Sequence, residues 1–250
     1  MRILLTNDDG LQSSSLEALS ARLKQDHDVW LVAPDTERSA SSHSITLNGA
    51  IEVANPYPGV YACNGTPADC VALALLGLIE VEIDLVISGP NRGPNLGTDI
   101  IYSGTAAAAR QAVLMGVPAV AVSLAADNSH RIDPLSLEFL ARNIPIFLKL
   151  ASCDHFLNVN LPASMGNHAD IRVTCPSIRI YDDVLDIVQR KDGKLSCRIT
   201  GPTPKSHPAP GSDYDAIAAG AVSISPISTH PVNQQIEERY ESAEFWTGES

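Results

Sequence analysis

The sequence predicts an α/β protein built on a parallel sheet that helices cover. The first half of the chain alternates strand-like and helix-like segments, as successive β-α units do. Several strand-like runs are apolar throughout, which is typical of strands buried on both faces. The chain of 250 residues lies near the upper limit for one domain and is long enough for a large core.

Short apolar runs mark the strands that this fold needs. Core strands are expected at residues 3–5, 29–33, 59–63, 84–88, 117–124 and 156–161. The run at 156–161 reads as the last strand of the core. A hairpin is also expected over residues 45–53, where Asn48-Gly49 has the composition of a two-residue turn.

Helical segments lie between these runs. They are expected at residues 14–23, 66–77, 105–115 and 135–151. Ser14 and Glu17 have the spacing of a capping box. Thr66 and Pro67 suit the cap and the first position of the second helix. Pro145 lies inside the fourth pattern, so we expect a kink or a break there.

The composition changes after residue 165. We therefore expect a catalytic core over residues 1–165 and a β-rich extension over 166–250 that packs on the core or on a partner subunit. Two β-rich stretches in the extension are joined by a turn near residues 191–194. An appended β-arm of this kind suits oligomerisation, so a homo-oligomer is expected.

Bulk properties exclude several classes of partner. The net charge of −12 argues against a grip on a nucleic-acid duplex, which needs clustered Lys and Arg. No apolar stretch approaches the roughly 20 residues that span a bilayer, so no membrane partner is expected. The five cysteines are scattered and odd in number. Reduced thiols and a cytoplasmic location are the expectation.

The N-terminal strand ends in two adjacent acids, Asp8 and Asp9, followed by Gly10. Neighbouring side chains on a strand point to opposite faces, so both carboxylates converge only where the backbone turns. Gly10 makes such a turn easy. Because two carboxylates held together repel, a divalent, oxygen-seeking metal between them is the simplest resolution.

Two further loops follow strands of the same sheet, where ligands of open parallel sheets bind. The loop after residues 29–33 contains Ser39. The glycine-rich segment 89–104 contains Asn91 and Asn95, whose amides suit either a hard metal or a phosphate.

The end of the glycine-rich segment offers an anion site. Ser103, Gly104 and Thr105 precede an alanine-rich helix. A helix start presents unpaired N–H groups and a positive dipole end, which favour phosphate. Capping alone would also explain Ser103, and turns would explain Asn91 or Asn95. It is their joint placement at strand ends that favours a functional site.

Other residues leave alternatives open. His43, His207 and His230 are weaker site candidates. Tyr102 suits packing as well as base stacking. Residues 64–69 lie at another strand-to-helix junction, where helix capping explains them as well as a place in the pocket does.

These motifs resemble those of the SurE (survival protein E) family of metal-dependent nucleotidases. The matching stretches are ILLTNDDG at the N-terminus, Ser39, GTPADCV at 65–71 and SGPNRGPNLGTDIIYSGT at 88–105. The resemblance covers essentially the whole chain. One departure is Ala40, which stands where a glycine commonly follows the serine.

The resemblance implies a Rossmann-like three-layer core with a protruding hairpin and a C-terminal segment that builds dimers or tetramers. It implies one divalent metal ion per subunit, Mg²⁺ or Mn²⁺, bound by Asp8, Asp9, Ser39 and Asn91. The implied activity is that of a 5′-nucleotidase, which hydrolyses nucleoside monophosphates to nucleoside and phosphate with broad tolerance for the base.

We expect metal-assisted hydrolysis in which Asp8 and Asp9 are the catalytic carboxylates, with Asp8 favoured to orient the water. Asn95 and residues 103–105 would hold the phosphate. One alternative is an aspartyl-phosphate phosphatase of the haloacid dehalogenase type. Such sites need Asp-x-Asp after the first strand, where this chain has Asn7-Asp8-Asp9. Another is a non-catalytic nucleotide- or metal-binding module, which would bind nucleotide without turnover.

Overall fold

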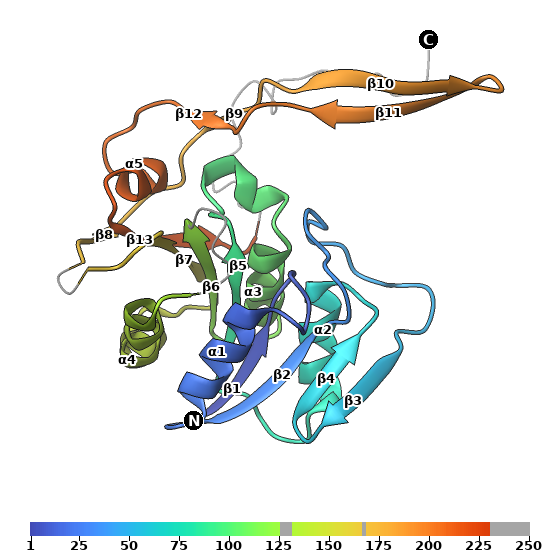
Figure 1. Ribbon diagram of the computed structural model, residues 1–250. Helices are drawn as coiled ribbons and strands as arrows, with labels where there is room; N and C mark the ends of the chain where they lie inside the picture. The colour runs from blue at the N-terminus through green and yellow to red at the C-terminus, as the bar shows by residue number, and fades with distance from the viewer. Residues whose placement is uncertain (126–131, 167–168, 231–250) are drawn as a thin grey trace, which may run out of the picture.

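One large sheet runs through the protein (Figure 1). The computed structural model describes residues 1–125, 132–166 and 169–230 of the chain. The strands of the sheet are β1 (Arg2–Thr6), β2 (Asp28–Pro34), β3 (Val53–Tyr57), β4 (Val60–Cys63), β5 (Leu85–Arg92), β6 (Ala119–Ala125), β7 (His155–Pro162), β8 (Ile171–Val173) and β13 (Val222–Ser228). Their order is β3-β4-β2-β1-β5-β6-β7-β13-β8, and every pair from β4 to β7 is parallel. The expected α/β class is confirmed.

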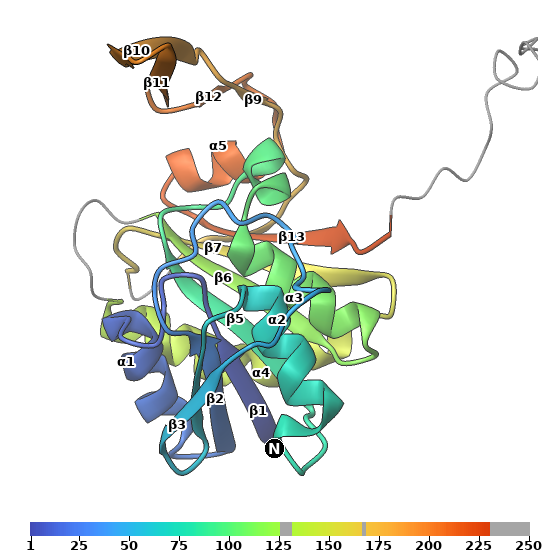
Figure 2. The ribbon, with the colours of Figure 1, turned by 90° about the vertical axis from the view of Figure 1, so that its right-hand side faces the viewer.

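Helices cover both faces of the sheet and complete three layers. The helices α1 (Ser14–Leu23) and α4 (Pro134–Leu150) pack on one face, and α2 (Pro67–Leu73) and α3 (Gly104–Leu114) on the other. Figure 2 shows α1 on one side of β1 and β2, with α2 and α3 on the opposite side. Two short helical turns, η1 (Ala74–Leu78) and η2 (Gly97–Ile101), follow α2 and β5. No helix in the described ranges is long and apolar enough to cross a membrane.

The strand β1 shows how the sequence pattern produces two cores. Ile3 and Leu5 face the core under α1 and α4, whereas Leu4 between them faces the core under α2 and α3. All three side chains are fully buried. Each contributes about 1.5–3 kcal/mol of hydrophobic stabilisation, which explains why this short run forms a central strand.

The hairpin expected over residues 45–53 is wrong. The observed hairpin joins β3 to β4 through a turn at Pro58-Gly59, where Gly59 has a φ of 74°. The earlier segment is held in another way, because Thr46 donates two hydrogen bonds, from N and Oγ1, to the Asp69 carboxylate at 2.9 and 2.8 Å. These hydrogen bonds to the start of α2 determine the conformation here, although Asn48-Gly49 has the composition of a hairpin turn.

Two helix details also differ from expectation. The α1 helix begins at Ser14, so Ser13 occupies the cap position and the expected Ser14–Glu17 capping box is wrong. The α4 helix continues through Pro145 as one element, so the break that was one of the two expected outcomes is absent. Its buried face lies on both sides of the proline, so packing compensates for the hydrogen bond that proline removes. That face consists of Ser136, Phe139, Leu140, Ala141, Ile144 and Phe147.

The extension adds strands to the same sheet, so β7 is not the last strand of the core as expected. β13 pairs antiparallel with β7, and β8 pairs parallel with β13. Because β13 is hydrogen-bonded to β7 on one side and to β8 on the other, it is an interior strand. This pairing joins segments far apart in sequence, which periodicity does not reveal.

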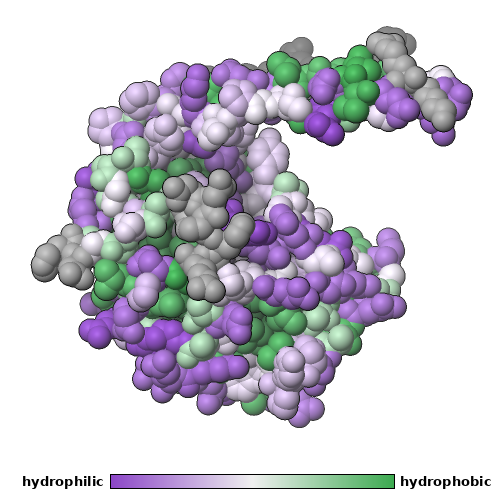
Figure 3. Space-filling view, in the orientation of Figure 1, coloured by the Kyte–Doolittle hydropathy of each residue, from purple (hydrophilic) through white to green (hydrophobic). Residues whose placement is uncertain are grey.

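Residues 179–206 of the extension form an arm above the sheet (Figure 1). β10 (Val184–Lys191) and β11 (Lys194–Thr200) make a projecting two-stranded ribbon, and the turn expected near residues 191–194 is confirmed (Figure 1). β9 (Arg179–Ile180) pairs with β12 (Lys205–Ser206), and α5 (Asp213–Ala218) precedes β13. Figure 3 shows apolar side chains gathered on the ribbon. The exposed ones include Val184, Leu185, Ile187, Val188, Leu195 and Ile199.

We expect the substitution Asp69→Asn to destabilise the fold in a pH-dependent way. Asp69 is 2 % exposed and accepts hydrogen bonds from Thr46 and Thr66, forming a capping box with Thr66 at the start of α2. Burial raises the pKa of Asp69, but these hydrogen bonds outweigh it and hold the pKa below its ordinary value. The ionised carboxylate therefore stabilises the folded state above the unfolded-state pKa of about 3.9. That stabilisation is lost as the pH falls through the folded-state pKa.

The measurement is urea unfolding of the wild type and the variant at about pH 7 and about pH 3. At the higher pH the variant should lose about 1–3 kcal/mol of unfolding free energy, and the difference should shrink at the lower pH. A difference of equal size at both pH values would contradict this role.

Candidate metal and phosphate site

The site lies where the strand order reverses. The chain passes from β1 to β2 on one side and later returns to β5 on the other side of β1. Such a switch point leaves a crevice at the carboxyl ends of the strands. The turn after β1 is closed by Asn7, whose Nδ2 donates to the Gly10 carbonyl and whose Oδ1 accepts from Gly10 N, at 3.0 and 3.1 Å. Gly10 has a φ of 92°, which suits glycine.

Asp8 is buried at the start of α3. Thr105 donates from Oγ1 to Asp8 Oδ1 at 2.7 Å and from N to Oδ2 at 3.2 Å. This places a carboxylate at the positive end of the helix dipole. A Cβ on Gly104 would lie 2.9 Å from Asp8 Cβ and 3.0 Å from Oδ2, so glycine permits the close approach. Burial raises the pKa of Asp8, the Thr105 hydroxyl opposes the rise, and the charge of Asp9 adds to it.

Asp9 has a different partner. Arg92 donates from Nε to Asp9 Oδ1 at 2.9 Å and from its backbone N to Oδ2 at 3.2 Å. Arg92 also approaches Glu37 at 3.4 Å, and Glu37 accepts a 2.8 Å hydrogen bond from Ser39. A chain of polar contacts therefore joins the loops that follow β1, β2 and β5.

A β-bulge positions Asn91. The pairing of β5 with β6 shifts between Ser88 and Asn91, which brings Asn91 opposite Ser123. Bulges re-aim side chains beside functional sites. Asn91 Nδ2 donates to the Gly93 carbonyl at 2.8 Å, which assigns the nitrogen and leaves Oδ1 as the oxygen able to bind a cation.

A cavity of about 330 Å³ gathers most of the predicted residues. It is lined by Asp8, Ser39, Ala40, Asn91, Arg92, Asn95, Asp99, Tyr102, Ser103 and Tyr181. Asp9 instead lines an adjacent cavity, together with Gln12 and Arg92. Among the described residues, none of the three histidines considered as candidates lines the 330 Å³ cavity, and His43 bonds Gln111 at 2.9 Å.

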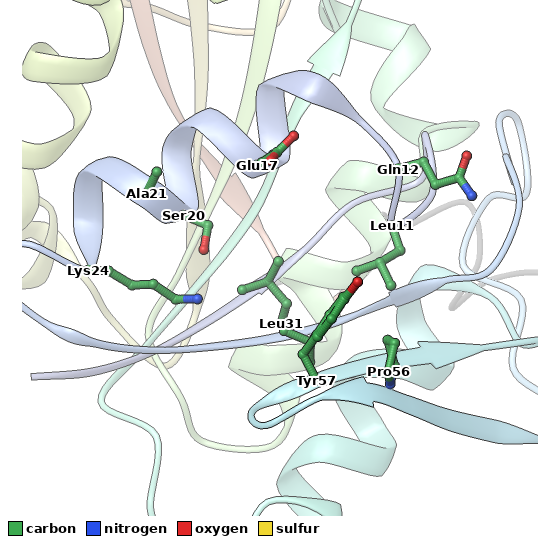
Figure 4. Close-up of a pocket in the computed structure, with 10 residues that line it drawn as sticks. Leu11, Gln12, Glu17, Ser20, Ala21, Lys24, Leu31, Pro56 and Tyr57 are labelled. Atoms are coloured by element: carbon green, nitrogen blue, oxygen red, sulfur yellow. The ribbon is translucent and has the colours of Figure 1, made fainter.

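A larger cavity of about 610 Å³ lies elsewhere, between α1, β2 and the β3–β4 hairpin (Figure 4). Leu11, Leu31, Pro56 and Tyr57 contribute to its wall. It shares no lining residue with the cavity that holds Asp8. The larger cavity is therefore separate from the residues that carry the predicted chemistry.

The loop that holds Ser39 adopts an uncommon backbone conformation. Ala40 and Ser42 have φ values of 56° and 52°, in the left-handed region that favours glycine. Ala40 is the position where the sequence departs from the glycine common in the resembling family. Ser42 fixes the loop by donating from N to the Tyr102 carbonyl at 3.0 Å. Strained backbone of this kind is concentrated at functional sites.

Asn95 is held by a buried network that the sequence analysis did not identify. Asn160 Oδ1 accepts from Asn95 N at 2.9 Å, and the amide groups of Asn158 and Asn160 both donate to the Asn95 carbonyl, at 2.9 and 3.0 Å. Asn95 Nδ2 donates to Ser123 Oγ at 2.8 Å, which uses one of its two hydrogens. The available signal was the two asparagines at alternate positions of β7, whose residues after His155 are otherwise apolar.

The three residues at the start of α3 have different roles. Ser103 caps the helix by accepting a 3.0 Å hydrogen bond from Ala106 N. Both donors of Thr105 bind Asp8, so Thr105 positions that carboxylate. Gly104 gives Asp8 the space it needs.

The donor chemistry fits a hard divalent cation. No group of three or more His, Cys, Asp or Glu side chains within the described ranges forms a metal site. The candidate set instead combines the carboxylates Asp8 and Asp9 with the neutral oxygens of Ser39 and Asn91. All four donors are oxygens, which Mg²⁺ and Mn²⁺ prefer. A cation would also offset the cost of the Asp8 charge, which is buried beside that of Asp9.

Comparisons with known proteins identify the family of this chain. The family model described as Survival protein SurE matches residues 3–183. The chain belongs to the SurE family. A curated relative from Heliobacterium modesticaldum, named 5′-nucleotidase SurE, is 40% identical over 91% of this chain and 86% of its own length. A relative of the same name from Geobacter sp. (strain M21) is 39% identical over 98% and 100%.

A solved structure supports the SurE fold. The crystal structure of the SurE protein from Aquifex aeolicus superposes with a TM-score of 0.83 at 31% identity, covering 97% of this chain and all of that one. The expected Rossmann-like architecture is thereby confirmed. The haloacid dehalogenase alternative and the non-catalytic alternative receive no support from these matches.

We expect Asn160→Leu to destabilise the protein more than Asn158→Leu does. The first change leaves the buried Asn95 N–H without an acceptor, at a cost of about 1–3 kcal/mol. The second removes one of two donors to the same carbonyl, which Asn160 still satisfies. Urea unfolding of the two variants measures the difference. A larger loss in Asn158→Leu would mean that the Asn95 backbone does not depend on Asn160.

Proposed function

We propose that this SurE protein is a metal-dependent 5′-nucleotidase that hydrolyses nucleoside monophosphates to nucleoside and phosphate. The observation that carries the proposal is the buried Asp8 at the start of α3, in one cavity with Ser39 and Asn91. This cavity lies at the carboxyl ends of the parallel strands, where such sheets bind ligands. The name 5′-nucleotidase SurE, which the relatives carry, agrees with that chemistry.

In this proposal Asp8, Asp9, Ser39 and Asn91 hold one Mg²⁺ or Mn²⁺ ion per subunit. Arg92 occupies one lone-pair direction on each Asp9 oxygen, and a carboxylate oxygen keeps another for a cation. A bound divalent ion supplies Lewis-acid polarisation of the phosphoryl group and offsets charge on its oxygens.

The protein's own groups position the reactants. Asp8 accepts a hydrogen bond from the attacking water and orients that water toward phosphorus, while Thr105 holds the carboxylate in position. The second Nδ2 hydrogen of Asn95, the Ser103 hydroxyl and the Gly104 N–H serve as phosphate donors. These donors are preorganised by the buried asparagine network and by the helix start, so they need no rearrangement as charge develops.

The metal-dependent reaction predicts phosphate release from AMP and GMP in the presence of Mg²⁺ or Mn²⁺, measured as inorganic phosphate. EDTA should abolish it, and restoring the metal should restore it. Asp8→Asn should lower the rate by about 100-fold or more, because the variant loses a charged ligand and the water-orienting group.

Asp35→Asn is the matched control, since Asp35 follows β2 but does not line the cavity. It should retain wild-type activity. Full activity in Asp8→Asn, or release of phosphate that EDTA does not affect, would rule out the scheme.

We further propose a homo-oligomer, a dimer or a tetramer, in a cytoplasmic setting. The ribbon β10–β11 projects from the body and exposes apolar side chains that a second subunit would cover (Figure 3). All five cysteines are free, which suits a reducing compartment.

Light scattering should detect the oligomer, and variants of the ribbon should show whether the ribbon forms the subunit interface. Leu185 and Ile199 are paired across β10 and β11 and are 66% and 77% exposed, so the double variant L185S/I199S should lower the measured mass. Asp186 and Arg198 form the next pair, on the opposite face, and D186S/R198S is the control that should leave it unchanged. A monomeric wild type, or equal effects of both double variants, would contradict the proposal.

A further inference from the structure

We propose that Tyr102 and Tyr181 form the nucleobase subsite of this protein. The inference rests on the proposed nucleotidase function and extends it to the part of the substrate that does not react. Both rings line the cavity that contains Asp8 and Ser103. The volume of about 330 Å³ lies within the range of small-molecule sites, roughly 300–1,000 Å³.

The two rings form a corner suited to a flat aromatic group. Their centroids lie 6.2 Å apart and their planes meet at 89°. A base that stacks on one ring therefore meets the other ring edge-on, and both arrangements are favourable between aromatic systems. Tyr102 is 54% exposed, so it has ring surface available for such contact.

Tyr102 lies next to the proposed phosphate site. Tyr102 directly precedes Ser103, which is one of the proposed phosphate donors. A phosphate at Ser103 would leave the attached nucleoside beside the tyrosine corner. The Tyr102 carbonyl accepts a hydrogen bond from Ser42 N at 3.0 Å. This bond connects the backbone of Tyr102 to the loop that carries Ser39.

Asp99 holds Tyr181 in place. The Tyr181 hydroxyl donates to Asp99 Oδ1 at 2.5 Å, and Arg179 Nε donates to Asp99 Oδ2 at 2.9 Å. The Arg179 guanidinium in turn lies 5.4 Å from the centre of the Tyr214 ring. The Tyr181 hydroxyl and the Arg179 guanidinium thus hold the Asp99 carboxylate in a fixed position, and the two tyrosine rings are the aromatic surfaces that the subsite offers to a base. Stacking on such surfaces tolerates every base, since each has a π-face.

The larger cavity of Figure 4 is the competing place for a base. It contains one tyrosine, Tyr57, which is 71% exposed. That cavity shares no lining residue with the one that holds Asp8 and Ser103. Tyr57 therefore provides a matched control, an exposed tyrosine in a cavity that does not contain the proposed phosphate donors.

The test compares two substrates that differ in the base. AMP and ribose 5-phosphate carry the same phosphomonoester, but only AMP has a base. The ratio of kcat/KM for AMP to kcat/KM for ribose 5-phosphate should fall about tenfold in Tyr102→Ala and in Tyr181→Leu, as expected for loss of one stacking partner. Tyr181→Phe keeps the ring and should keep most of the ratio. Tyr57→Ala should keep the wild-type ratio.

The outcomes separate the subsite from the activity. A ratio that falls in Tyr102→Ala and Tyr181→Leu, but not in Tyr57→Ala, supports the subsite. A ratio that stays constant in the first two variants, or that falls in Tyr57→Ala instead, overturns the subsite while AMP hydrolysis by the wild type preserves the nucleotidase function. A wild type that hydrolyses neither substrate overturns both.

Discussion

The hydrogen bonds between Asp8 and Thr105 are the contact on which the site depends. They join the end of the central strand β1 to the start of α3, two elements nearly a hundred residues apart in the chain. The contact requires Gly104, because a Cβ there would lie within 3.0 Å of the Asp8 carboxylate. The same three residues therefore satisfy the helix N-terminus, bury a charge and place that charge in the cavity where Ser39 and Asn91 lie.

The negative charges of the two adjacent acids, Asp8 and Asp9, are stabilised by different partners. Asp8 turns to the helix N-terminus, whereas Asp9 pairs with Arg92 and lines a neighbouring cavity. From the sequence, a cation between the carboxylates was the simplest answer. In the fold, the start of α3 stabilises the negative charge of Asp8 and Arg92 stabilises that of Asp9. A metal ion would stabilise both charges further. The raised pKa of Asp8, caused first by burial, indicates that part of the cost remains for a cation to offset.

The sequence predicted what depends on local chemistry and missed what depends on distant pairing. Apolar runs located the parallel strands, and the Thr66 cap located α2. Asn48-Gly49 was misleading because Asp69, more than twenty residues away in sequence, holds Thr46. The place of β13 beside β7, and the hydrogen bonds of Asn160 to Asn95, depend on register between remote segments. One-dimensional periodicity carries no information about that register.

The extension helps to build the site as well as projecting an arm. Asp213 is fully buried and accepts from Gly97 N at 2.7 Å and from Ser177 N at 2.9 Å. A Cβ at Gly97 would lie 1.8 Å from the Ser177 carbonyl oxygen, so the glycine lets the extension pack against the loop after β5. That loop continues through η2 to Tyr102, whose partner ring Tyr181 also comes from the extension. The proposed base end of the cavity thus depends on residues after 165, while the proposed phosphate end depends on the core. A substrate that fills both ends would contact both parts of the chain.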